Sequence, residues 1–292
     1  MSLESQVPLT FTFTIGLTGS GKSKINELIK TENTFVNNEK TTFLLLDDYI
    51  TSNGNYKKNV SNIIRDTKKN TPNWYNQFHK AYMKSKTNGC IETPSNNAKP
   101  KSQSNLVNTN LTNRANLKTA KNILLKTEKG CSRKFDYEFF RALKDNENIV
   151  YESIGRNFEN ISWVFPILPP NYTIKLVFLL FNDLGVLKER IDSRGDKNLA
   201  LYTNPNTNPN TNPNKPAPRY PDSSLTNLKA SLSNMLATLE EALAYRGTRN
   251  IQIQIYENTP STKVPSMIYY SKQPLENIIL QYKNFARRQM NL

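Results

Sequence analysis

The chain has 292 residues and a formal net charge of +15, from 39 lysine and arginine residues against 24 aspartate and glutamate residues. Its single histidine argues against a Ser-His-Asp relay and against a histidine-rich metal site. Its two cysteines, Cys90 and Cys131, do not have the spacing of metal ligands, and we expect them to be reduced thiols. The longest apolar run, residues 176 to 181, is too short to cross a bilayer, and no hydrophobic segment precedes the first strand. We therefore expect a soluble cytoplasmic protein without a membrane partner.

The first expected strand, residues 9 to 15, alternates apolar and β-branched side chains, and residues 23 to 30 place Ile25, Leu28 and Ile29 on one helical face. Between them, Gly16-Leu17-Thr18-Gly19-Ser20-Gly21-Lys22-Ser23 matches the phosphate-loop pattern. Glycines let successive N–H groups point into one concavity, in front of the positive end of a helix dipole. The sequence thus predicts a site for ATP and Mg²⁺. The expected nucleotide-binding residues are Gly16, Thr18, Gly19, Ser20, Gly21, Lys22 and Ser23, with the Ser23 hydroxyl on the metal.

Residues 41 to 50 contain a continuous apolar run typical of a doubly buried parallel strand, followed by Asp47 and Asp48. The carboxyl ends of such strands are where ligands bind in open α/β sheets. The block from about residue 52 to 134 is polar, and we expect a partly disordered insertion with short amphipathic pieces around Val60 and Trp74.

Regular patterns return with a helix over residues 135 to 144 and a strand over 148 to 153. Further expected elements are a strand at 173 to 181, a short helix at 184 to 193, a helix from 221 to 245, a strand at 251 to 256 and a helix at 274 to 290. An Asn/Pro-rich loop at 203 to 218 interrupts them. The alternation predicts a single α/β domain, a P-loop NTPase three-layer αβα sandwich with a mainly parallel five-stranded sheet.

Phosphoryl transfer requires a clamped nucleotide, a base near the acceptor hydroxyl and cations over the transferred group. Candidates follow at the expected edge of the sheet: Asp47, Asp48, Glu152, Arg156, Arg190, Arg194 and Arg219. Two alternatives stay open at this point. In the first, one of the two aspartates caps a helix and has no catalytic role. In the second, Arg190 and Arg194 are solvated surface charges or pair with neighbouring acids.

These motifs in series resemble the zeta-toxin family of P-loop kinases, which phosphorylate UDP-N-acetylglucosamine or related sugar nucleotides. The matching segments are the phosphate loop, Asp47-Asp48-Tyr49-Ile50, Glu152-Ser153-Ile154-Gly155-Arg156, Lys188-Glu189-Arg190-Ile191 and Arg219-Tyr220-Pro221. The resemblance implies that Lys22 and Ser23 hold the triphosphate and Mg²⁺, and that Asp48 is the general base. Asp48 is also expected, with Ser23, to bind the metal. It also implies that Arg190 and Arg219 stabilise the transferring phosphoryl group. Asp47, Glu152, Arg156 and Arg194 would line the site of a UDP-sugar.

Two other readings remain. A polynucleotide or nucleoside kinase uses the same fold and would exploit the positive charge, although scattered, solvated lysines explain that charge equally simply. A non-catalytic nucleotide-binding module would keep the loop alone. A GTPase is disfavoured because the chain has no Asn-Lys-x-Asp motif.

Overall fold

The computed structural model describes residues 9–37, 40–69, 71–88, 130–204, 216–245, 247, 249–261, 264–270 and 274–290. The chain groups into two compact units, and each is described by itself. The first comprises Met1–Leu44, Arg141–Lys188 and Ser224–Leu292, and the second comprises Leu45–Phe140 and Glu189–Ser223. Of the helices in this described part, none is both long enough and apolar enough to cross a membrane.

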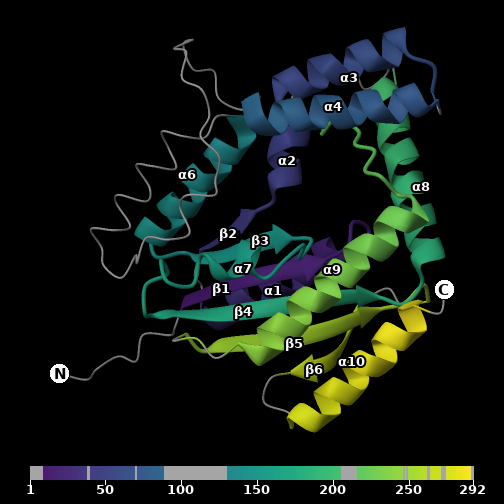
Figure 1. The fold of residues 1–292 in the computed structure, drawn as a ribbon. Helices are drawn as coiled ribbons and strands as arrows, with labels where there is room; N and C mark the ends of the chain where they lie inside the picture. Colours follow the sequence, from purple (N-terminus) through teal and green to yellow (C-terminus); the bar gives the residue numbers. More distant parts are fainter. Residues whose placement is uncertain are drawn as a thin grey trace. The chain divides into compact units, whose positions relative to one another are not determined.

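The first unit is built on a six-stranded sheet with the order β2-β3-β1-β4-β5-β6 (Figure 1). The strands are β1 (Leu9–Gly16), β2 (Thr41–Leu44), β3 (Asn148–Ser153), β4 (Tyr172–Phe181), β5 (Ile251–Asn258) and β6 (Ser266–Tyr270). The first five are parallel, and β6 pairs antiparallel with β5. The central strands β1 and β4 are buried along most of their length, as their apolar runs predict.

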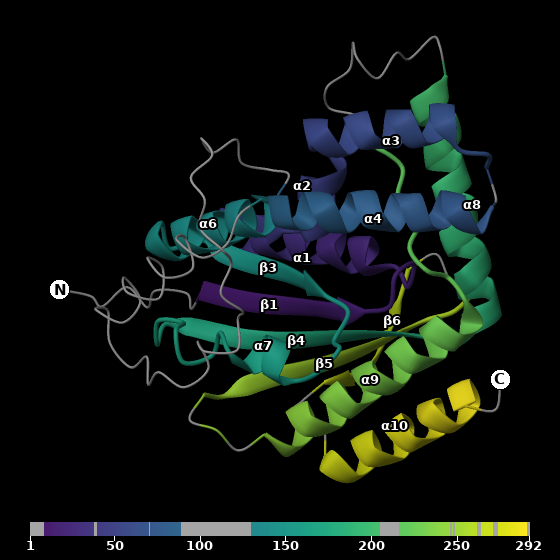
Figure 2. The same cartoon turned by 45° about the horizontal axis from the view of Figure 1, so that its top comes forward.

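Helices cover both faces of this sheet (Figures 1 and 2). On one face, α1 (Lys22–Asn37) packs Ile25 against Val177 and Leu179 of β4. On the other, α9 (Leu225–Ala244) lies over the turn after β3, where the Thr238 hydroxyl donates to the Gly155 carbonyl at 3.0 Å. The helices α7 (Glu159–Ser162) and α10 (Leu275–Met290) complete the unit. The unit is therefore the expected three-layer α/β arrangement of a P-loop NTPase-like fold.

The second unit is helical. It contains α2 (Leu46–Thr51), α3 (Gly54–Asp66) and α4 (Pro72–Asn88), while α6 (Gly130–Lys144) and α8 (Leu184–Thr203) each run from one unit into the other. Asn53 begins α3, because its side chain accepts from the backbone N–H groups of Asn55 and Tyr56. The buried core of the unit comprises Ile50, Tyr56, Val60, Ile63, Trp74, Phe78, Ala81, Leu199, Tyr202, Ala217 and Tyr220.

Three sequence-based expectations need correction. The second strand ends at Leu44 and not near Ile50, and Asp47 and Asp48 lie in the first turn of α2, where carboxylates suit the helix dipole. The sheet has a sixth strand, β6, which the five-strand prediction omitted. The helix that begins at Leu184 continues to Thr203, twice as far as expected. Gly195 lies inside this helix, and a Cβ at this position would lie 2.7 Å from the Tyr220 ring. The glycine therefore serves close packing and does not end the helix.

Within the expected insertion, the amphipathic pieces are the helices α3 and α4. The predicted disorder after residue 88 and most of the Asn/Pro-rich loop fall on residues 89–129 and 205–215, outside the described residues. The assignment of the whole chain to one domain stays a prediction.

A buried carboxylate joins three elements at the start of β2 and β3. Glu147, 4% exposed, lies 2.6 Å from Lys40 Nζ and 2.8 Å from Arg141 Nη1 and accepts a hydrogen bond from Thr42 Oγ1. Burial raises its pKa, but the hydrogen bonds from Arg141, Lys40 and Thr42 outweigh burial and lower the pKa to about 2.

We expect Glu147→Gln to lower the free energy of unfolding at pH 7 by about 2 kcal/mol, because the buried carboxylate that pairs with Lys40 and Arg141 is lost. A lowered pKa stabilises the fold above the pKa of the unfolded chain, so this contribution should vanish as the pH falls from about 4.5 towards 2. Urea unfolding at a series of pH values measures it. A variant that loses as much stability at pH 2.5 as at pH 7 would contradict the charge-based explanation.

Candidate functional site

The glycine-rich loop lies between β1 and α1, in the context that the sequence predicts. Gly19 and Gly21 have φ values of 80° and 104°, in the left-handed region that favours glycine. A Cβ on Gly16 would lie 2.7 Å from Ser20 Oγ and 3.0 Å from the Leu179 carbonyl oxygen. The loop conformation therefore requires the glycines at these three positions.

Lys22 begins α1 and turns its side chain back across the loop. Its Nζ donates to the Gly16 and Leu17 carbonyls at 2.7 and 3.0 Å and lies 3.4 Å from Glu152 Oε1. The side chain is 7% exposed, whereas Glu152 is 28% exposed and Ser23 is exposed. The structure thus brings together Lys22 and Glu152, two of the predicted site residues, and places a buried cation inside the loop.

The sequence analysis did not identify Asn258, which also fixes this loop. It is the last residue of β5, is buried, and donates from Nδ2 to the Ser20 carbonyl at 2.7 Å. The same Nδ2 lies 2.6 Å from where a Cβ on Gly21 would be. The available signal was its place at the carboxyl end of a parallel strand, but the expected strand stopped at Tyr256.

We expect Asn258→Ala to weaken ATP binding about tenfold, because the loop loses one buried hydrogen bond and the Ser20 carbonyl loses its donor. Titration with a fluorescent ATP analogue measures the change. Asn258→Asp is the matched control: it keeps the size but turns an oxygen towards the carbonyl, so it should bind at least as weakly as the alanine variant. Binding by the aspartate variant at the wild-type level would show that the hydrogen bond does not support the loop.

In the second unit, Asp47 and Arg219 form an ion pair although 172 residues separate them. Arg219 Nη1 donates to one carboxylate oxygen of Asp47, and the Tyr82 hydroxyl donates to the other. The Arg219 guanidinium also lies 4.5 Å from the centre of the Tyr82 ring, in a cation–π contact. Burial lowers the pKa of Arg219 to about 10, so it remains cationic at neutral pH. We call Asp47, Tyr82 and Arg219 the arginine cluster.

The segment around Arg219 is held on both sides. The Ala217 N–H donates to the Thr51 carbonyl at 2.8 Å, and the Tyr56 hydroxyl donates to the Pro218 carbonyl at 3.0 Å. Tyr220 stacks edge-on with the rings of Trp74, Tyr75 and Phe78 and donates to Asp196 at 3.0 Å. The helices α3 and α4, which lie in the expected polar insertion, thus position a predicted catalytic arginine.

The other predicted residues are near the surface. Asp48 is exposed in α2, Arg156 is exposed in the turn after β3, and on α8 Arg194 is exposed and Arg190 half-buried. The predicted site residues are therefore seen as two sets, one in each unit. The first contains the loop, Glu152 and Arg156, and the second contains the two aspartates, Arg190, Arg194 and Arg219.

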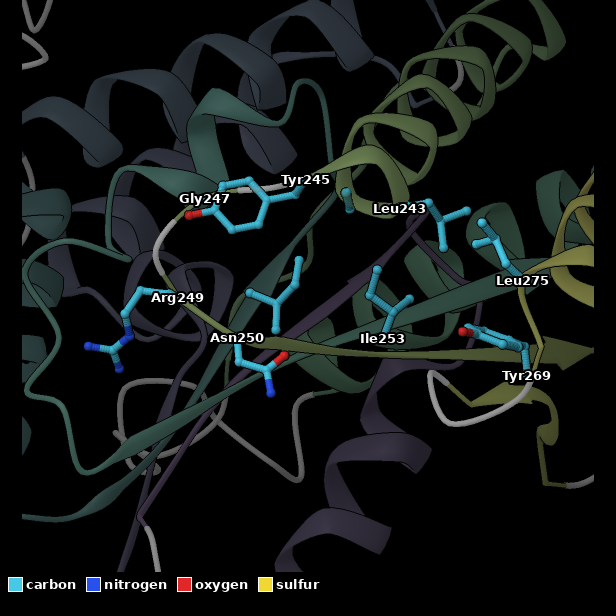
Figure 3. Close-up of a pocket in the computed structure, with 10 residues that line it drawn as sticks. Leu243, Tyr245, Gly247, Arg249, Asn250, Ile253, Tyr269 and Leu275 are labelled. Carbon is cyan, nitrogen blue, oxygen red and sulfur yellow. The ribbon is translucent and has the colours of Figure 1, made fainter.

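Figure 3 shows a surface pocket of about 550 Å³ in the first unit, at the amino end of β5. Its lining includes Leu243, Ile253, Tyr269 and Leu275, and its one charged lining residue is Arg249. That guanidinium donates to the carbonyls of Leu168, Pro169 and Tyr172, so it fixes the loop before β4. The phosphate loop follows the carboxyl end of β1, at the opposite edge of the parallel sheet, so we do not assign the phosphate site to this pocket.

A mainly parallel sheet with a glycine-rich loop between its first strand and first helix defines a P-loop NTPase-like α/β protein. No known family matches the sequence, and no curated protein is similar to it. Among solved structures, the chain is similar to one from a study of the PezAT chromosomal toxin–antitoxin system of the human pathogen Streptococcus pneumoniae. The two share 12% identity with a TM-score of 0.45, over 98% of this chain and 85% of the other.

Proposed function

We propose that the protein is an ATP-dependent phosphotransferase that phosphorylates a hydroxyl group. The observation that carries the proposal is Lys22, a buried cation whose Nζ is held by the carbonyls of a loop with two left-handed glycines. In this loop the Lys22 ammonium lies near two carbonyl oxygens and, at 3.4 Å, the carboxylate of Glu152. A polyphosphate would give it a stronger anionic partner than two carbonyls, and the N-terminus of α1 adds a favourable dipole.

The residues of the loop fit a nucleoside triphosphate with Mg²⁺. Gly19 and Gly21 adopt the left-handed backbone angles with which successive N–H groups can form an anion-binding concavity. Lys22 and the loop N–H groups would bind the phosphates, and the Ser23 hydroxyl would bind the metal, which neutralises phosphate charge when bound. Glu152 fits a role beside the acceptor, since it lies next to Lys22 at the carboxyl end of β3.

Asp48 and Arg219 are the proposed base and charge-stabilising cation. Asp48 is exposed, which suits a group that must take a proton from an acceptor, whereas the neighbouring Asp47 is engaged by Tyr82 and Arg219. Arg219 is a permanent cation in a fixed orientation, as preorganised stabilisation of a phosphoryl group requires. Arg190 and Arg194 are proposed as further contacts to anionic groups.

A UDP-sugar is the proposed acceptor, on the resemblance of the motifs to zeta toxins. The decisive experiment incubates the full chain with ATP, Mg²⁺ and separate acceptors, and detects phosphorylated products by mass spectrometry. The acceptors are UDP-N-acetylglucosamine, a nucleoside mixture and a 5′-hydroxyl oligonucleotide. Transfer to the sugar nucleotide supports the proposal, and transfer to the oligonucleotide alone identifies a polynucleotide kinase. If no acceptor is phosphorylated although the protein binds ATP, the protein is a non-catalytic nucleotide-binding module.

A further inference from the structure

The α3–α4 hairpin, residues 54 to 88, concentrates positive charge. Eight lysine and arginine residues and one aspartate give it a net charge of +7, nearly half of the +15 of the whole chain. The basic residues are Lys57, Lys58, Arg65, Lys68, Lys69, Lys80, Lys84 and Lys86. In this segment the basic residues are therefore concentrated, whereas the sequence analysis treated the lysines as scattered.

The fold turns most of this charge outward. Both helices bury one face in the same core, α3 through Tyr56, Val60 and Ile63 and α4 through Trp74 and Phe78. They lie side by side in both views (Figures 1 and 2). The opposite faces carry the exposed Lys58 and Arg65 on α3 and the exposed Lys80 and Lys84 on α4, and the connection between the helices adds the exposed Lys68 and Lys69. We call these six residues the basic face.

Acidic side chains neutralise only part of the basic face. Arg65 is bonded to Asp66, with both side chains more than half exposed, and Lys69 lies 3.1 Å from Asp196. Lys58, Lys68 and Lys80 are exposed cations on a rigid, aromatic-cored scaffold. Charges at helical spacing on a rigid surface suit a partner whose own charges repeat regularly.

We propose that the basic face binds single-stranded nucleic acid through its phosphates. The exposed surface favours this partner over an acidic protein, because a protein interface usually has an apolar centre. In the described part of the hairpin, the large apolar side chains that are exposed are Tyr75 and Met83, at 43% and 42%. The cations of the basic face, and not stacking side chains, therefore carry the proposed contact with phosphates. None of the six residues of the basic face is a proposed catalytic residue, so the proposed binding does not depend on phosphoryl transfer.

The test is fluorescence anisotropy with a labelled 20-nucleotide single strand, as oligo-dT and as oligo-U, without ATP and over a series of salt concentrations. The variant is Lys58→Gln/Lys68→Gln/Lys80→Gln. Each phosphate contact on a single strand contributes about 0.7 to the slope of log K against log salt. The triple variant should therefore lose about two units of slope and about 100-fold in affinity at 0.1 M salt. The matched control, Lys30→Gln/Lys229→Gln/Lys283→Gln, removes three exposed lysines of the first unit and should keep the wild-type slope.

Three results would overturn the proposal: no binding by the wild type at 50 mM salt, equal losses in both triple variants, or competition by poly-glutamate as strong as by unlabelled oligonucleotide. The last would assign the face to acidic proteins. Oligonucleotide binding by the Lys22→Ala variant separates this proposal from the proposed function, since it should persist if the chain proves not to be a kinase.

Discussion

Replacing Lys22 with alanine is expected to lower the rate of phosphoryl transfer by about three orders of magnitude. The Lys22 ammonium is the cation that the structure places inside the loop, held by two carbonyls at 2.7 and 3.0 Å. The variant also removes the cation that lies 3.4 Å from Glu152 Oε1. Steady-state transfer to the acceptor found by mass spectrometry measures the loss, and hydrolysis of ATP serves if water is the acceptor.

Lys24→Ala is the matched control. Lys24 lies two residues further along α1, carries the same charge, and forms an exposed ion pair with Glu27 at 2.9 Å. Its loss should change activity less than twofold and stability by less than about 0.5 kcal/mol. Because Glu152 is partly exposed, Lys22→Ala should lower the free energy of unfolding by only about 1 kcal/mol. Thermal unfolding therefore distinguishes a loss of catalysis from a loss of the folded state. Full activity in the Lys22 variant would exclude the loop as the nucleotide site.

The loop could be predicted from the sequence because the signals that identify it are local. Glycines at fixed spacing, a preceding strand and a following amphipathic helix all lie within residues 9 to 30. The parallel sheet likewise follows from the alternation of strand and helix patterns. The end of the second strand could not be placed, because the apolar run Leu44-Leu45-Leu46 has no glycine or proline to separate β2 from α2.

The supporting residues of the candidate site could not be predicted, since their partners are distant in the chain. Asn258 reaches Ser20 across 238 residues, and Tyr82 reaches Asp47 across 35 residues. Neither residue has a motif around it. The aromatic side chains from Trp74 to Tyr82 indicated an amphipathic helix, but only the folded unit shows that this helix presents Tyr82 to Arg219.

The adjacent aspartates provide a sharper test of the chemistry, because the structure gives them different surroundings. Asp48→Asn is expected to lower kcat by a factor of about 10² to 10⁴, with ATP affinity and stability close to wild type, since Asp48 is exposed and would act as the base. Asp47→Asn should act differently. It leaves the partly buried Arg219 beside a neutral amide. Because the Asp47 side chain is 43% exposed and solvent screens the pair, it should lower the free energy of unfolding by about 1 kcal/mol.

The Asp47 variant should also lower kcat, but by displacing Arg219, and Tyr82→Phe distinguishes this positioning role from direct catalysis. Phenylalanine keeps the ring under the guanidinium and removes only the hydroxyl that donates to Asp47. We therefore expect Tyr82→Phe to retain activity within about tenfold and Tyr82→Leu to approach the Asp47 variant, because leucine also removes the cation–π contact. If Asp48→Asn instead keeps wild-type kcat while Asp47→Asn abolishes turnover without loss of stability, the base is Asp47. In that case the acceptor would have to displace Tyr82 and Arg219 from Asp47 before the carboxylate could take a proton.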